Sequence, residues 1–139
     1  MRIYKNKLTN HPRGDISKKK NRGIIVGATG ATGSKLVKLL LESDNWEKIT
    51  TISRKPVLEG NSHKKLNEVI IDSFDKLDKT FDHWKGHESF FNCIGTTRKI
   101  AGGAKQFVDI EYGISLMSAE LANKAHIPNA SVISASGAN

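Results

Sequence analysis

A glycine-rich turn is predicted at Gly27-Ala28-Thr29-Gly30-Ala31-Thr32-Gly33. An apolar run, residues 23–26, precedes it, and an amphipathic stretch, residues 34–41, follows it. Strand, glycine turn and helix in this order are typical of dinucleotide binding. The first glycine permits a tight turn, the second lets backbone N–H groups approach a pyrophosphate, and the third allows close packing of helix on sheet. The spacing is G-x-x-G-x-x-G rather than G-x-G-x-x-G, so a glycine turn without a ligand is the alternative.

Strand and helix patterns alternate along the rest of the chain. Further strands are predicted at residues 48–53, 67–71, 89–94 and 130–134, and helices at 74–84 and 106–124. This alternation indicates an α/β, Rossmann-like parallel sheet with flanking helices and right-handed crossovers. We expect the strand order 3-2-1-4-5, which places the glycine turn beside the topological switch point.

Positive charge is concentrated near the amino terminus. The net charge is +8, and residues 1–22 carry eight Lys or Arg against one acid, which leaves residues 23–139 nearly neutral. We therefore predict a basic disordered tail over 1–22 and a Rossmann domain over 23–139. A nuclear-import or anionic-partner patch at Lys18-Lys19-Lys20 is one alternative for the tail, and a serine-poor mitochondrial transit peptide is another. The near-neutral domain argues against nucleic-acid binding.

The single cysteine and the hydropathy pattern limit the cellular location. Because Cys93 is the only cysteine, no disulfide can form within the chain, and a reducing compartment is favoured. No apolar run approaches the ~20 residues of a membrane span, and no secretory signal is recognisable. We expect a soluble, cytoplasmic chain that also enters the nucleus. The five histidines are scattered, so no metal site is expected, and Cys93 is expected to be buried and inert.

Basic residues follow the predicted second strand, at Ser53-Arg54-Lys55. A Rossmann site that selects NAD has an acid there, bound to the ribose 2′-OH. A guanidinium and an ammonium instead suit a 2′-phosphate, which favours NADP(H). The alternative is a solvated pair of loop residues.

With these segments placed, the chain resembles the Tat-interacting-protein family of atypical short-chain dehydrogenases/reductases, an NADPH-binding group. The likeness runs from about Gly23 to the last residue and includes the glycine turn and residues 53–55, 92–98, 107–112, 118–122 and 133–138. The block Ile94-Gly95-Thr96-Thr97-Arg98 is more particular to this family than the glycine turn is.

The resemblance implies a set of cofactor contacts and partners. Thr29, Gly30, Ala31 and Thr32 would contact the pyrophosphate, Arg54 and Lys55 the 2′-phosphate, and Ile94 with Gly95 the ribose on the nicotinamide side. Asp72 resembles the acid that meets the adenine amino group, with capping of the next helix as its alternative role. The implied partners are nuclear import receptors and a translation elongation factor.

The reductase mechanism needs a tyrosine with a lysine four residues later, whose charge lowers the tyrosine pKa. Tyr4 and Tyr112 are instead followed at that spacing by Leu8 and Leu116. Ser136 is our candidate for the catalytic serine, with a serine that merely ends a strand as the alternative.

We therefore expect a catalytically incomplete chain, truncated before the Tyr-x-x-x-Lys helix, whose fold lacks its C-terminal part and leaves the fifth strand at the sheet edge. Two functions are considered. One is the NADP(H)-binding domain of a short-chain dehydrogenase/reductase. The other is a regulatory interaction protein that depends on NADPH.

Overall fold

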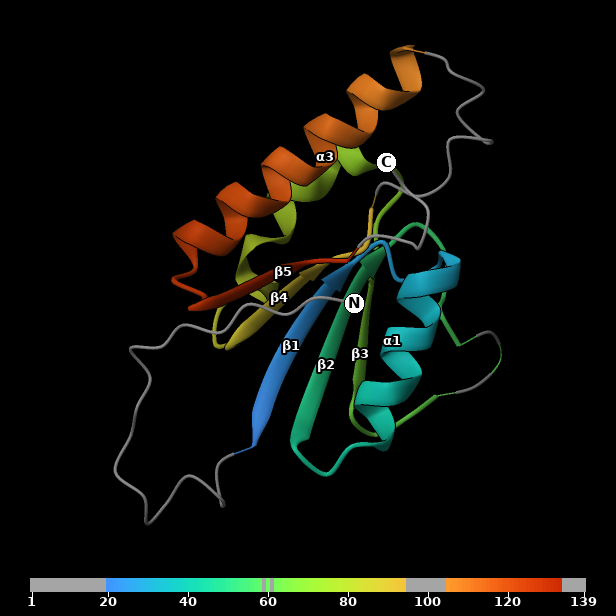
Figure 1. Ribbon diagram of the computed structural model, residues 1–139, viewed down its shortest axis with the longest axis vertical. Coiled ribbons are helices and arrows are strands. Elements are labelled where there is room, and N and C mark those ends of the chain that lie inside the picture. The colour runs from blue at the N-terminus through green and yellow to red at the C-terminus, as the bar shows by residue number, and fades with distance from the viewer. Residues whose placement is uncertain (1–19, 59, 61, 95–104, 134–139) are drawn as a thin grey trace.

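Five strands form a single parallel sheet. The computed structural model describes residues 20–58, 60, 62–94 and 105–133, with the backbone alone over 105–111. The strands are β1 (Asn21–Val26), β2 (Trp46–Ser53), β3 (Leu66–Ile70), β4 (Ser89–Asn92) and β5 (Asn129–Val132). Their order is β3-β2-β1-β4-β5, and every neighbouring pair is parallel (Figure 1). The predicted Rossmann-like α/β fold and its strand order are confirmed.

Helices cover both faces of this sheet in the described residues. They are α1 (Ala31–Glu42), the 3-10 helix η3 (Phe74–His83) and α3 (Lys105–Lys124). Figure 1 shows α1 on one face and α3 with η3 on the other. Side chains alternate across a strand, so β1 contributes to both cores. Ile25 packs in the α1 core, whereas Ile24 and Val26 pack with residues of η3 and α3.

The helix predicted at residues 74–84 is present but winds as a 3-10 helix. Its buried residues, Leu77 and Thr80, are three apart, which matches the three residues per turn of this helix type. Trp84 follows the helix, is fully buried and donates its indole N–H to Thr80 Oγ1 at 2.9 Å. A spacing of three or four residues predicts a helix but does not distinguish the two types.

Strand ends differ from the sequence expectations by a few residues. β2 begins at Trp46, two residues early, where the indole packs 5.7 Å from the Phe91 ring. β4 ends at Asn92 instead of Ile94 because the Asn92 side chain accepts the Ile94 N–H at 2.9 Å and turns the chain. β5 lies at the sheet edge, and its Val132 is 65% exposed.

Several predictions lie outside the described residues. They concern the tail over residues 1–19, Gly95, and the candidate Ser136. In the parts that the structure does describe, no helix combines the length and apolarity needed to cross a membrane.

Candidate functional site

The glycine turn leaves the carboxyl end of β1 and needs glycine at its first position. Gly27 has a φ of +87°, in the left-handed region that residues with a side chain rarely adopt. A Cβ atom at Gly27 would lie 2.7 Å from the Cys93 carbonyl carbon and 2.8 Å from the Ile94 nitrogen. The turn is therefore pressed against the backbone that follows β4, so the β1 and β4 ends form one continuous surface.

The third glycine brings α1 close to the turn. Gly33 is buried in the first helical turn. A Cβ atom there would overlap the Gly27 carbonyl oxygen and lie 2.8 Å from the Ala28 Cα. Both neighbours are backbone and cannot swing aside, so the start of the helix depends on glycine at this position.

Among the residues that the structure describes, no side chain caps the amino end of α1. Its N-cap residue is Gly30, and its first turn contains no acid. The first helical bond runs from the Ser34 N–H to the Gly30 oxygen at 2.9 Å. The amides of Ala31, Thr32 and Gly33 precede that bond and have no acceptor within the helix. Together with the positive end of the helix dipole, they form a site for an anion.

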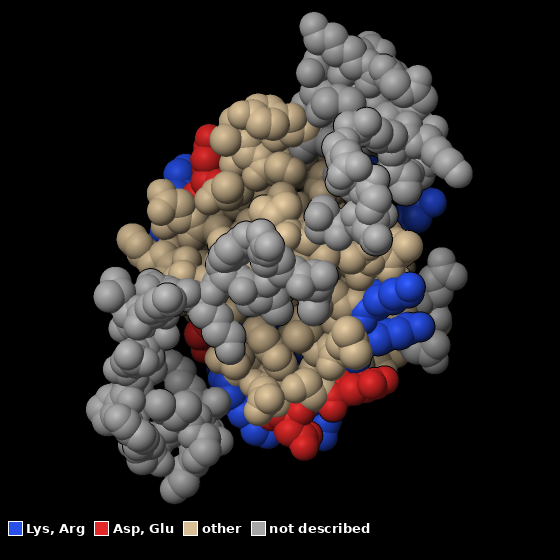
Figure 2. Space-filling view, in the orientation of Figure 1, with Lys and Arg blue, Asp and Glu red and all other residues tan. Residues whose placement is uncertain are grey.

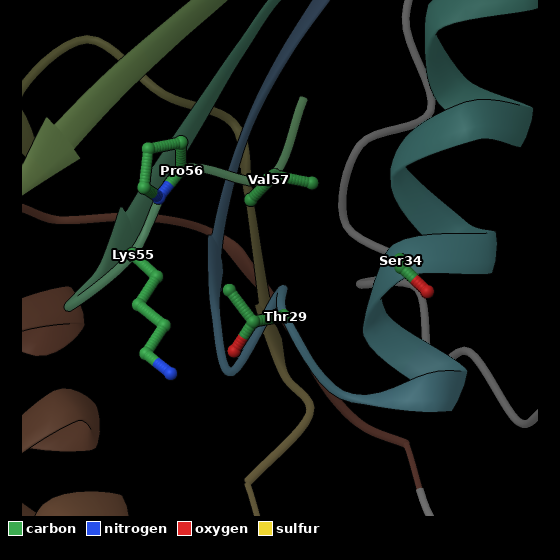
Figure 3. Close-up of a pocket in the computed structure, with 5 residues that line it drawn as sticks. All are labelled: Thr29, Ser34, Lys55, Pro56 and Val57. Atoms are coloured by element: carbon green, nitrogen blue, oxygen red, sulfur yellow. The ribbon is translucent and has the colours of Figure 1, made fainter. Parts of the chain in front are cut away.

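A pocket of about 370 Å³ opens beside this helix end (Figure 3). Its lining comes from the glycine turn, the start of α1 and the segment after β2, through Thr29, Ser34, Lys55, Pro56 and Val57. Figure 3 shows the Lys55 amine and the Thr29 hydroxyl directed into the same space. The structure thus brings together two predicted site residues, Thr29 and Lys55, that are far apart in the sequence.

Sequence reasoning missed three of the residues that line this pocket. Ser34 follows the last glycine directly, and its place in the first turn of α1 was a usable signal. Pro56 and Val57 belong to a loop without a recognisable pattern. They line the pocket because the loop folds back toward α1, where Val57 packs against the core beneath that helix.

Arg54 and Lys55 are adjacent, yet their side chains have different surroundings. The Arg54 guanidinium carbon lies 5.5 Å from the centroid of the Phe74 ring, whereas Lys55 lines the pocket. The Ser53 hydroxyl donates to the Lys55 carbonyl at 2.6 Å, and this hydrogen bond fixes the turn from Ser53 to Lys55. Across the described residues, neither cation belongs to an ion pair. Both charges are therefore available to a ligand.

Asp72 follows β3 and is exposed, with its carboxylate 3.0 Å from Lys76 Nζ. The alternative role of Asp72 as a helix cap is wrong, because Ser73 is the N-cap of η3 and its side chain accepts the Asp75 N–H. Ser73 has the better position, since a cap accepts from the residues two or three places further on.

Cys93 and Ile94 follow β4 and lie next to the glycine turn. Cys93 is 4% exposed, and burial raises the pKa of its thiol to about 11. The thiol therefore stays protonated at neutral pH, as an inert structural cysteine does. Ile94 is half-buried beside the turn, where its backbone adjoins Gly27.

The chain has relatives among characterised sequences, although no family model matches it. It is 36% identical over 116 residues to Protein FMP52, mitochondrial, of Debaryomyces hansenii, which covers 83% of this chain and 50% of that protein. It is 34% identical over 128 residues to Protein HTATIP2 of Rattus norvegicus, which covers 91% of this chain and 52% of that protein. The chain thus spans about half the length of the curated relatives it matches.

Solved structures share the fold. An oxidoreductase, ylbE, from Lactococcus lactis superposes with a TM-score of 0.57 at 24% identity, over 80% of this chain and 47% of that one. A short chain dehydrogenase from Burkholderia cenocepacia in complex with NADP superposes with a TM-score of 0.57 at 18% identity. The superposition covers 77% of this chain and 47% of that one. At these identities the likeness supports the fold alone.

The relatives also correct the expected location. A cytoplasmic chain that also enters the nucleus was predicted, and this prediction is wrong, because the FMP52 relatives from several yeasts are named as mitochondrial proteins. A mitochondrial transit peptide in residues 1–22, which the scarcity of acids there allows, stays a prediction. The implied import-receptor and elongation-factor partners stay predictions.

The resemblance found in the sequence is confirmed by HTATIP2, and the FMP52 proteins extend it to fungi. Over about half of their length, HTATIP2 and the FMP52 proteins are therefore homologues of this chain.

Proposed function

We propose that this chain binds NADP(H) as the cofactor domain of a short-chain dehydrogenase/reductase. One observation carries the proposal: Lys55 lines the same pocket as Thr29 of the glycine turn, beside the uncapped end of α1. The pocket thus combines a site for a diphosphate with a cation at the place where NAD-selecting sites have an acid.

The charges around the pocket favour the phosphorylated cofactor. The free amides of α1 would hold the diphosphate, and Gly27 and Gly33 let the backbone approach it. Lys55 and Arg54 would then face the 2′-phosphate, where a cation stabilises the phosphate charge and an acid would repel it. A ribose 2′-OH alone would gain much less from these two cations. We therefore expect NADPH to bind more tightly than NADH.

The remaining assignments are part of the same proposal. Asp72 would meet the adenine amino group, and the backbone at Ile94 and Gly95 would border the ribose near the nicotinamide. The nicotinamide supplies hydride chemistry when the cofactor is bound, while the residues described above bind and orient it. We propose binding rather than turnover, because neither Tyr4 nor Tyr112 has a lysine four residues later. Ser136 stays a prediction for the catalytic serine.

Titration of the purified chain with NADPH and with NADH, followed by nucleotide fluorescence, tests the proposal. Lys55→Glu should weaken NADPH binding by roughly 10- to 100-fold, as expected for loss of a charge-assisted bond, and should change NADH binding much less. Lys38→Glu is the matched control, because Lys38 is exposed on α1 and does not line the pocket. Equal wild-type affinities for the two cofactors, or equal effects of the two substitutions, would contradict the proposal.

The names of the FMP52 relatives support a second proposal, a mitochondrial location for this chain. A fluorescent protein fused to the carboxyl terminus of the whole chain, expressed in yeast, should coincide with a mitochondrial marker. Diffuse fluorescence through the cytosol would refute this location and leave the cofactor proposal untouched.

A further inference from the structure

We propose that Phe74 is a positioning residue that sets the preference for NADPH by holding the Arg54 guanidinium, an inference that rests on the proposed function. The two residues come from different elements. Arg54 follows β2, and Phe74 is the first residue of η3. The guanidinium carbon lies 5.5 Å from the ring centroid, within the range in which a cation is attracted to an aromatic face.

Phe74 is a rigid support for this contact. Its ring is half-buried and packs against the core cluster that includes Leu77 and Trp84. The backbone beneath the ring is fixed as well, because Ser73 caps the helix by accepting the Asp75 N–H. A long, exposed arginine side chain that rests on such a ring loses less freedom when it binds a ligand.

The ring orients the guanidinium without neutralising it. A carboxylate partner would occupy the N–H donors of the guanidinium, whereas an aromatic ring has no carboxylate oxygens to accept from them. Throughout the described residues, Arg54 forms no ion pair, and the carboxylate of Asp72, two residues before Phe74 in the sequence, is paired with Lys76 Nζ at 3.0 Å. Arg54 thus keeps its full charge and its planar fork for a phosphate.

Phe74 also explains why Arg54 and Lys55 have different surroundings. The Ser53–Lys55 hydrogen bond closes the turn after β2, Lys55 lines the pocket, and the Phe74 ring holds Arg54 outside that lining. A 2′-phosphate would thereby be approached by Lys55 from the pocket and by Arg54 from the η3 side. A shorter aliphatic residue at position 74 would release Arg54 to solvent.

The test compares NADPH and NADH dissociation constants for the wild type, Phe74→Leu and Phe74→Tyr. Phe74→Leu should lower the preference for NADPH by roughly two- to fivefold, the effect of one exposed cation–π contact, with NADH affinity unchanged. Phe74→Tyr keeps the ring and should retain the preference. Phe81→Leu is the matched control: its half-buried ring lies on the same helix under Lys85 Nζ at 5.0 Å, and its loss should leave the preference unchanged.

A double-variant comparison separates positioning from a structural effect. If Phe74 acts through Arg54, adding Phe74→Leu to a chain that carries Arg54→Met should not lower the preference for NADPH further. A fall of equal size in both backgrounds, or an equal loss of NADPH and NADH affinity, overturns the inference while the proposed function stands. A wild-type chain that binds neither cofactor overturns both. Circular dichroism of each variant verifies that the chains compared are folded.

Discussion

Two neighbouring threonines of β2 should respond to the same substitution with opposite signs. Thr50 and Thr51 are both fully buried, and their side chains point to opposite faces of the sheet. Thr50 Oγ1 lies 2.9 Å from His87 Nε2, whereas Thr51 Oγ1 has no hydrogen-bond partner within the described structure. Replacement by valine keeps the shape and removes only the hydroxyl. We predict that Thr50→Val destabilises the fold and that Thr51→Val stabilises it.

The magnitudes follow from the polar groups that each change leaves or removes. His87 Nδ1 lies 3.1 Å from the Trp84 carbonyl, which can only accept, so Nδ1 carries the proton and Nε2 accepts from Thr50. Thr50→Val leaves Nε2 unpaired in a side chain that is 6% exposed, at a cost of about 1–3 kcal/mol. Thr51→Val removes an unpaired buried hydroxyl and should contribute about 1–2 kcal/mol of stability.

Thermal unfolding followed by circular dichroism measures both effects. A free-energy change of 1 kcal/mol shifts the midpoint by about 4 °C in a domain of this size. The two variants should therefore lie on opposite sides of the wild type by several degrees. Shifts of the same sign for both variants would refute the reasoning, because the hydrogen-bond partner would then not decide the outcome. Urea unfolding provides the free energies directly and shows whether the slope has changed.

Other predictions concern a histidine, two glycines and the cysteine. Burial lowers the pKa of His87 below 6.5, with Lys48 and Arg22 adding to the shift, so the unfolded chain binds the proton more readily. The contribution of His87 to stability should therefore be fully present above about pH 6.5 and be lost as the solution is acidified, and this loss should be smaller in His87→Gln. Gly33→Ala should destabilise the fold and weaken NADPH binding. Gly113→Ala, where a methyl group meets no neighbour within 4 Å, should stabilise α3 by about 0.5–1 kcal/mol, and a result in the reverse order would contradict the packing. Cys93 should react with a coloured disulfide reagent only after denaturation, and rapid reaction of the native chain would refute its burial.

The sheet could be predicted because local signals and general rules agreed. The glycine turn, the run of β-branched residues at 48–53 and the stop at Pro128 each mark a boundary in the sequence. Right-handed crossovers then leave few strand orders open, and the order with the glycine turn at the switch point is the one found. The pattern of polar and apolar residues was therefore enough to predict the fold and to place Thr29 and Lys55 at the carboxyl edge of the sheet.

Contacts between distant residues could not be predicted in the same way. His87 is bonded to Thr50 across 37 positions, and no periodicity links them. The buried spacing of Leu77 and Thr80 is equally compatible with an α-helix, so the 3-10 form depends on packing that local sequence does not encode. Such pairs emerge only when the sheet brings elements together.

The cations after β2 show where sequence reasoning about the site stops. From the sequence alone, Arg54 and Lys55 are both assigned to one phosphate of the ligand, because two adjacent cations at a strand end look equivalent. Their directions differ because Ser53 closes the turn and because the Phe74 ring, twenty residues further along the chain, attracts the guanidinium. The two residues therefore have different surroundings: Lys55 lines the pocket, whereas Arg54 lies against an aromatic ring that the sequence around residue 54 does not reveal. If the proposed function holds, the preference for NADPH depends on residues of β2 and η3 together.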